Sequence, residues 1–252
     1  MHINITEQIL ADQQTLEYRT ALEISRQFSD FIRKTAHEFR TPLSLIVTCL
    51  ELYRIQADPD KRTRYIGQID EQTRYLTRLT EQLNLLASMN REATLDISNV
   101  NCNQLAETAH TALHSKAKAK QIALSLELQP DLTLIDGDVY KLLFVLRELI
   151  ENALRYSPSA AAVIVRTYDS ASAVIIEVMD AGIGISAAHT QRIFEPYFKT
   201  DPSRALNNSG MGLGLTFVKK IIEMHHGRIE VESVLHQGSI FRLILPISLP
   251  SY

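Results

Sequence analysis

The sequence predicts an α+β protein in which a helical hairpin, forming a dimeric four-helix bundle, precedes an α/β-sandwich domain. Two observations lead to this prediction. Residues 1–95 contain a single glycine, Gly67, and repeat apolar side chains at helical spacing. After about residue 100, helical segments alternate with β-branched, alternating segments, and two of the latter follow one another near the end of the chain.

The composition narrows the class of protein. The chain has 252 residues, enough for one large domain or two ordinary ones, and its 45% hydrophobic content excludes wholesale disorder. The net charge is −3 and no basic run is present, so we expect no nucleic-acid partner. Cys49 and Cys102 are too few for a disulfide framework and fit a reducing compartment.

No apolar run approaches the roughly 20 residues that a membrane helix needs. The first residues, MHINITEQIL, lack the basic and apolar regions of a signal peptide. We therefore expect a cytoplasmic protein, or the cytoplasmic portion of a membrane-bound one, and a sensor or membrane segment of any longer parent is not in this chain.

The first part reads as two amphipathic helices. A turn is expected at ADPDK (57–61), which holds a proline and two aspartates. Two helices joined by a short turn make an antiparallel hairpin, which cannot enclose a core alone, so a homodimer is the simplest solution. The apolar stripe before the turn comprises Ile32, Ala36, Phe39, Leu43, Ile46, Leu50 and Tyr53, and the one after it comprises Ile66, Ile69, Leu76, Leu79, Leu83 and Leu86.

The second part mixes strands and helices after a linker at residues 91–100. Strands are expected at 171–180 and as a pair within 227–246, and helices at 105–120, 139–156 and 215–226. His225 and His226 are expected to end the last helix, where positive charge is favourable. We assign residues 1–30 to an N-terminal signal-transmitting helix, 31–93 to the hairpin and 94–252 to the sandwich.

One histidine, His37, has neighbours that suit a reactive side chain. Ala36 lies in the apolar stripe, so His37 lies beside it, on a flank of the bundle that a partner can reach. Neutral imidazole is a good nucleophile at physiological pH. Glu38 is a candidate to hold the neutral tautomer or accept its proton, although adjacent side chains diverge on a helix. Thr41 shares the face of His37, because the two are four residues apart.

A polar stripe lies on the predicted helix 139–156. Glu148, Asn152 and Arg155 follow one another at steps of four and three. Asn152 offers a hard oxygen to Mg²⁺, and Arg155 offers donors to a phosphate oxygen. The opposite, buried stripe comprises Leu142, Val145, Leu146, Leu149 and Ala153.

Two glycine-rich segments follow. Asp180 ends a strand and can accept a hydrogen bond from an exocyclic amine such as that of adenine, while Gly182 and Gly184 let the backbone approach a base. FEPYFK (194–199), with Lys199 as a candidate phosphate contact, opens a polar stretch at 200–209 that is expected to form a lid. The loop that ends this stretch, and whose amides can receive phosphates, contains Gly210, Gly212 and Gly214.

These segments together resemble the sensor histidine kinase family. H-E-x-x-T-P at 37–42 is similar to its H-box, and E-N-A-x-R-Y, D-A-G-I-G-I, F-E-P-Y-F and G-M-G-L-G-L resemble its N, G1, F and G2 boxes in the same order. The resemblance runs from about Phe31 to Pro246. It implies a dimerisation and phosphotransfer hairpin and an ATP-binding domain of the gyrase, chaperone and histidine kinase type. It also implies ATP and Mg²⁺ as cofactors and a response regulator receiver domain as partner.

The resemblance also implies residue roles. His37 matches the histidine that is phosphorylated from ATP, Glu38 its acid/base neighbour, and Thr41 the residue that helps to remove phosphate from the partner. The nucleotide and metal residues that it implies are Asn152 as Mg²⁺ ligand, Arg155 and Tyr156 as the usual basic–aromatic pair, Asp180 as adenine reader, and Gly182, Gly184, Gly210, Gly212 and Gly214 as box glycines.

The chain departs from the family at Glu148, where the N box often has a second Asn. Glu148 is either a carboxylate on the metal side or, as in the related ATPases, a base for water. A different class of function also remains: a nucleotide-binding scaffold or ATPase whose hairpin serves only for dimerisation. That alternative predicts ATP binding without an acid-labile phosphoprotein.

Overall fold

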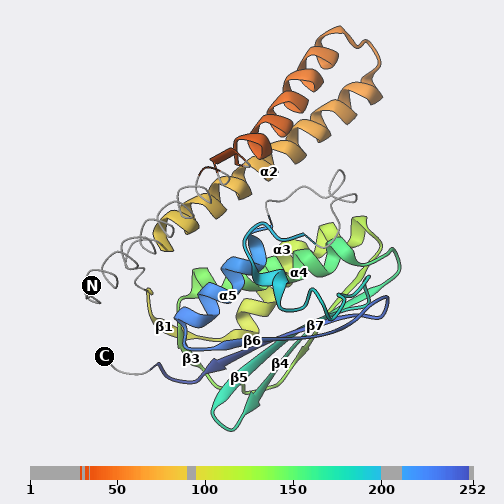
Figure 1. The fold of residues 1–252 in the computed structure, drawn as a ribbon. Helices are drawn as coiled ribbons and strands as arrows, with labels where there is room; N and C mark the ends of the chain where they lie inside the picture. The colour runs from red at the N-terminus through yellow and green to blue at the C-terminus, as the bar shows by residue number, and fades with distance from the viewer. Residues whose placement is uncertain (1–28, 30–31, 34, 90–94, 200–211, 250–252) are drawn as a thin grey trace, which may run out of the picture. The chain divides into compact units, whose positions relative to one another are not determined.

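The computed structural model describes residues 29, 32–33, 35–89, 95–199 and 212–249. It comprises a helical hairpin and an α/β sandwich, each described here by itself (Figure 1). Apart from Ser29, the predicted signal-transmitting segment at 1–30 lies outside these residues. None of the helices within the described ranges combines the length and apolarity that crossing a membrane requires.

The hairpin consists of a helix over residues 35–55 and α2 (Pro59–Met89). The predicted turn at 57–61 is shorter than expected, because α2 already begins at Pro59. Proline is favoured at the first helical position, where a missing N–H costs nothing. The Asp58 carboxylate also accepts the Asp60 N–H at 3.0 Å, as an N-cap does.

The inner row of the first helix differs from the predicted stripe. Its buried or half-buried members are Phe39, Pro42, Ile46, Cys49 and Tyr53, which step by three and four. The Cys49 thiol lies 3.3 Å from the Gln68 side-chain oxygen of α2, so this row faces α2. Leu43 and Leu50 of the predicted stripe are 49% and 40% exposed in the single chain, so they do not belong to the row that faces α2, and their place in a bundle with a second copy stays a prediction.

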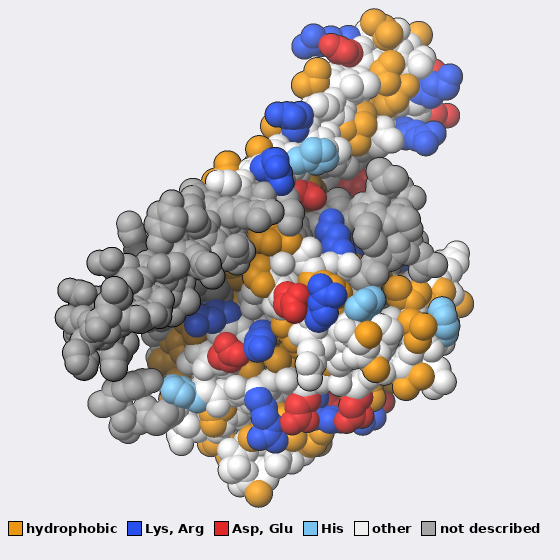
Figure 2. All heavy atoms as spheres, viewed as in Figure 1, with side chains coloured by type: hydrophobic (Ala, Val, Ile, Leu, Met, Phe, Trp, Pro, Cys, Tyr) orange, Lys and Arg blue, Asp and Glu red, His pale blue; other side chains and the backbone are white. Residues whose placement is uncertain are grey.

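Further large apolar side chains of the hairpin are exposed in the single chain, and Figure 2 shows hydrophobic side chains reaching its surface among charged ones. Exposed apolar rows of this kind are typical of a helix surface that packs against another chain. The exposed members of the hairpin are Ile32, Leu43, Leu45, Val47, Leu50, Leu52, Ile55 and Ile66.

The sandwich contains a five-stranded sheet of order β2-β4-β5-β7-β6. The strands are β2 (Ala123–Leu128), β4 (Ala162–Ser170), β5 (Ala173–Asp180), β7 (Gly238–Pro246) and β6 (Arg228–Val234). β2 and β4 are parallel and the other neighbours are antiparallel. Strands β1 (Ser98–Val100) and β3 (Ile135–Gly137) form a separate antiparallel pair, so the predicted linker at 91–100 ends in a strand.

Helices α3 (Cys102–Ala119), α4 (Val139–Tyr156) and α5 (Gly214–Met224) cover one face of this sheet (Figure 1). A short 3₁₀ helix, η1 (Arg192–Phe194), precedes α5. The core lies between the helices and the inward-facing side chains of the strands. All five residues of the predicted buried stripe of α4 are buried, so its opposite stripe faces outward from this core.

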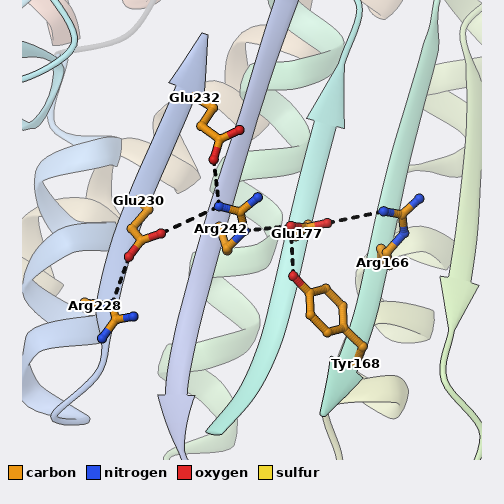
Figure 3. A network of polar contacts seen from close by, with 7 residues as sticks. All are labelled: Arg166, Tyr168, Glu177, Arg228, Glu230, Glu232 and Arg242. Carbon is orange, nitrogen blue, oxygen red and sulfur yellow. Dashed lines mark hydrogen bonds and ion pairs between the residues drawn. The ribbon is translucent and has the colours of Figure 1, made fainter. Parts of the chain in front are cut away.

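The other face of the sheet carries a row of alternating charges (Figure 3). Glu127, Arg166, Glu177, Arg242 and Glu230 lie directly opposite one another across the five strands. Glu177 is only 4% exposed, and its carboxylate accepts the Arg242 Nε–H at 2.7 Å. This bond raises the pKa of Arg242, so its guanidinium stays charged. Opposite charges at directly facing positions stabilise the strand register.

The end of α5 corrects the expected role of His225. α5 ends at Met224, two residues before the predicted end, and His225 is its C-cap. However, His225 is 1% exposed, and burial lowers the pKa of its imidazole, which disfavours the cation. Its Nδ1 donates to the Ile221 carbonyl at 2.8 Å and its Nε2 accepts the Asp138 N–H at 2.9 Å. His225 therefore acts as a neutral buried link to the N-cap of α4.

Candidate nucleotide and phosphoacceptor sites

Helix α4 presents the predicted polar stripe. Glu148, Asn152 and Arg155 are half-buried, whereas the opposite stripe is fully buried. The Asp138 side chain caps the helix by accepting the Lys141 N–H at 3.0 Å. The helix ends at Tyr156, which is 38% exposed. The three polar side chains thus stand on one side of a helix whose other side is anchored in the core.

The Asp180 turn is joined to the end of α4. The Ile183 N–H donates to the Tyr156 carbonyl at 3.2 Å. The Asp180 carboxylate accepts the Gly182 N–H at 2.8 Å. A Cβ on Gly182 would lie 2.7 Å from Asp180 Oδ1 and 2.8 Å from the Tyr156 oxygen, so a glycine is needed here. The tertiary structure therefore brings Tyr156, Asp180 and Gly182 together.

Burial raises the pKa of the Asp180 carboxyl, and the hydrogen bonds from the Gly182 and Ser239 amides oppose that rise. These amides use some of the acceptor positions of the Asp180 carboxylate and fix the direction in which the remaining positions point. A carboxylate held in this way can accept a hydrogen bond from an exocyclic amine, which is the chemistry that the sequence predicted for Asp180.

Gly184 has a backbone angle φ of +65°, and a Cβ there would collide with the Val234 carbonyl of β6. The turn is also tied to the β6–β7 connection, because the His236 N–H donates to the Ile183 carbonyl at 2.7 Å. Any side chain at position 184 therefore meets both a strained φ and a backbone clash. This explains the second glycine of the segment in physical terms.

Residues on either side of the predicted lid are joined by a hydrogen bond. The Tyr197 N–H donates to the Gly212 carbonyl at 3.0 Å. Gly212 has φ +69°, and a Cβ on it would lie 3.0 Å from the Phe198 oxygen. Lys199 follows directly and is half-buried. Gly210 and the predicted lid at 200–209 lie outside the described residues.

Glu148 reaches the start of α5. Its carboxylate lies against Gly214, the first residue of α5, so closely that a Cβ there would collide with Oε2. The N-cap position of α5, Leu213, provides no side-chain cap. The N-terminus of a helix attracts negative charge. Glu148 and the loop that is predicted to receive phosphates are therefore neighbours.

The donor set suits a hard cation bound together with a phosphate. Among the described residues, no group of three or more His, Cys, Asp or Glu side chains could hold a metal ion. Mg²⁺ does not need such a cage, because it is commonly held by one or two carboxylates or carbonyl oxygens together with substrate phosphates. Glu148 and Asn152, one turn apart on α4, match that requirement in type.

In the hairpin, His37 is exposed on the first helix. The Thr41 hydroxyl donates to the His37 carbonyl at 3.3 Å, so Thr41 lies one turn further along the same face. The Glu38 side chain accepts a hydrogen bond from the Tyr75 phenol of α2. Sequence reasoning missed Tyr75, because a contact between residues 37 positions apart leaves no local pattern.

Two family models match this chain. The His Kinase A (phospho-acceptor) domain matches residues 29–92, and the Histidine kinase-, DNA gyrase B-, and HSP90-like ATPase matches residues 137–249. The two matches define the class as a histidine kinase core, with an acceptor hairpin followed by an ATP-binding domain. The chain belongs to the sensor histidine kinases of two-component systems.

Individual relatives agree with this class. The chain is 30% identical over 223 residues to the alginate biosynthesis sensor protein KinB of Pseudomonas aeruginosa, covering 87% of this chain and 37% of KinB. It is 32% identical over 234 residues to the sensor protein kinase PmrB of the same species, covering 92% and 48%. The chain thus spans half or less of the length of these relatives.

A solved structure of histidine kinase ThkA in complex with response regulator protein TrrA has a TM-score of 0.67 to this chain. It is 23% identical, covering 93% of this chain and 66% of that one. At this identity the likeness supports the fold, which agrees with the predicted α+β class of a helical hairpin followed by a mixed sheet under helices.

Proposed function

We propose that this chain is the catalytic core of a sensor histidine kinase, which phosphorylates its own His37 from MgATP and passes the phosphoryl group to a response-regulator aspartate. One observation carries the proposal. The same chain combines an exposed histidine on a helical hairpin with a polar helix stripe and glycine turns that suit a nucleotide. The complex of the similar ThkA with its response regulator supports the class of partner.

The chemical step uses the neutral His37 imidazole. The lone pair of one ring nitrogen forms a bond to the γ-phosphorus, and the bond from that phosphorus to the leaving oxygen breaks, releasing ADP. The proton on the other ring nitrogen passes to Glu38. In the second step the phosphoryl group moves from His37 to the carboxylate of the regulator. Thr41, on the face of His37, orients water when phosphate is removed from that regulator.

In the nucleotide site, Asp180 reads the exocyclic amine of adenine, and Tyr156 borders the same turn. Arg155 and Lys199 contact phosphates as donors. The remaining members are backbone positions that approach the base or the phosphates, namely Gly182, Gly184, Gly210, Gly212 and Gly214. Bound Mg²⁺ supplies neutralisation of the charge that develops on the phosphates.

Glu148 belongs to the metal side of this proposal. Its carboxylate lies at the N-terminus of α5, where phosphates are also expected. Two anions at one helix end repel each other, so a cation between them is needed when the nucleotide binds. Asn152, one turn further along α4, offers the second oxygen. A base for water at this place would instead compete with His37 for the γ-phosphoryl group.

The proposal includes a homodimer and a cytoplasmic reaction. The exposed apolar residues of the hairpin, such as Leu43 and Leu50, are available to pack against a second copy in a four-helix bundle. We assign the dimerisation and phosphotransfer part to residues 31–93, the ATP-binding part to 94–252 and signal transmission to 1–30. The cytoplasm supplies ATP and fits the free thiols of Cys49 and Cys102.

The decisive experiment is labelling with γ-labelled ATP. The wild-type chain should acquire label that survives alkali and is lost in acid. His37→Gln should acquire none while it binds ATP with unchanged affinity, and His114→Gln, at an exposed histidine of α3, should label normally. Alkali-stable label on His37→Gln would overturn the assignment, and ATP binding without label in wild type would favour the scaffold or ATPase.

A further inference from the structure

The Glu38 carboxylate is engaged from the opposite helix of the hairpin. The Tyr75 phenol of α2 donates a hydrogen bond to Glu38 Oε2. Both side chains are half-buried, which protects the bond from competing water. A carboxylate that accepts a hydrogen bond from a partly buried phenol is held in a narrow range of side-chain rotamers.

His37 does not take part in this contact. It is exposed, and within the described part of the chain no hydrogen bond joins its ring to Glu38. The geometry of the helix explains this, because adjacent side chains point about 100° apart. When Glu38 points toward α2, its carboxylate points away from the flank that carries His37.

We infer that Tyr75 is a positioning residue that holds Glu38 away from His37 in the resting hairpin. This inference rests on the proposed function, in which Glu38 accepts the imidazole proton. To act, Glu38 must break its hydrogen bond with the Tyr75 phenol and form one with the His37 ring. The free energy of breaking the Tyr75 bond therefore adds to the activation barrier of His37 phosphorylation. The phosphoryl transfer step itself is unchanged.

The size of the effect follows from the bond that is lost. The net free energy of such a hydrogen bond is modest, because water takes the place of the lost partner once Glu38 has left Tyr75. Removing the phenol hydroxyl should therefore raise the first-order rate constant of His37 phosphorylation by roughly 3- to 10-fold. The KM for ATP should not move, because Tyr75 and Glu38 both lie in the hairpin.

The experiment measures His37 phosphorylation over a range of ATP concentrations in the full chain. Tyr75→Phe removes only the hydroxyl, and Tyr75→Leu is a second variant that keeps an apolar side chain. Tyr65→Phe is the matched control, since Tyr65 is half-buried on the same helix and has no hydrogen bond to Glu38. Glu38→Gln and the double variant Glu38→Gln with Tyr75→Phe complete a double-mutant cycle, which measures the coupling between the two side chains. Thermal unfolding of each variant reports on the fold.

We expect both Tyr75 variants to phosphorylate faster at unchanged KM, with Tyr65→Phe equal to wild type. We also expect Tyr75→Phe to have no effect once Glu38 is Gln. A slower or unchanged Tyr75→Phe, while Glu38→Gln is clearly impaired, would overturn the inference and leave the proposed function intact. If Glu38→Gln phosphorylates at the wild-type rate, the acid/base role fails, and the inference fails with it.

Discussion

Replacing His225 by Leu tests the buried link between α4 and α5. Leu removes both ring nitrogens but stays apolar and of similar size. The Asp138 N–H, on a residue that is 2% exposed, then loses its acceptor. The Ile221 carbonyl keeps a partner, because it still accepts the backbone N–H of residue 225 at 3.1 Å. The loss is therefore one unsatisfied buried donor.

An unsatisfied buried donor costs about 1–3 kcal/mol. For a domain of this size class, about 1 kcal/mol corresponds to roughly 2–4 °C, so the melting temperature should fall by about 2–12 °C. The assay is calorimetry of the full chain, following the transition that ATP shifts upward, because a ligand stabilises the domain that binds it. His114→Leu, on the exposed side of α3, is the control and should change little.

The pH dependence adds a second test. Burial lowers the pKa of His225 below its ordinary value of 6.5. As the pH falls, the imidazole of residue 225 is therefore protonated in the unfolded chain before it is protonated in the folded one. The stability that is present above pH 6.5 is lost as the pH falls toward the lower pKa of the folded state. Although burial raises the pKa of Asp138, hydrogen bonds from Lys141 hold it below 3.8, so any stability that depends on Asp138 is lost at a lower pH than the stability that depends on His225. His225→Leu should flatten the slope just below pH 6.5, and an unchanged slope together with an unchanged melting temperature would refute the reasoning.

Three further predictions concern the proposed sites. Asp180→Asn loses a charge-assisted hydrogen bond worth about 1.5–3 kcal/mol, so titration should show roughly 10- to 150-fold weaker ATP binding; unchanged affinity would remove Asp180 from the site. Glu148→Gln should weaken MgATP binding and slow His37 phosphorylation, whereas loss of phosphate release alone, measured in a His37→Gln background, would indicate a base for water. Thr41→Ala should spare His37 phosphorylation and slow dephosphorylation of the regulator, which phosphatase rates with the purified partner can contradict.

The sequence by itself predicted the class of fold and the residue types of the chemistry. Helical periodicity marked α3, α4 and α5, and alternation marked β5, β6 and β7, because both patterns depend on neighbours within a few residues. The stripes of α4 were predicted from its spacing alone. The motif around His37 was equally local, since it lies within six consecutive residues.

Other features were decided only by the tertiary structure. Strand β2 pairs in parallel with β4, and neither strand was predicted from the sequence. Their pairing joins residues 39 positions apart, such as Ala123 and Ala162, so no local pattern reveals it. In the first helix, the row that contains Pro42 and Cys49 faces α2, whereas Leu43 and Leu50 lie in a neighbouring row that is exposed in the single chain, and local heptad spacing does not distinguish the two rows.

The polar contacts of Glu38 and His225 are of the same kind. Glu38 finds Tyr75 at a separation of 37 positions, and His225 finds the Asp138 amide at a separation of 87. No local pattern encodes such pairs, because the partner is set by the packing of whole elements and by the need to satisfy buried polar groups. The sequence therefore predicted the candidate reacting groups, whereas the contacts that hold Glu38 and His225 in place were set by the tertiary structure.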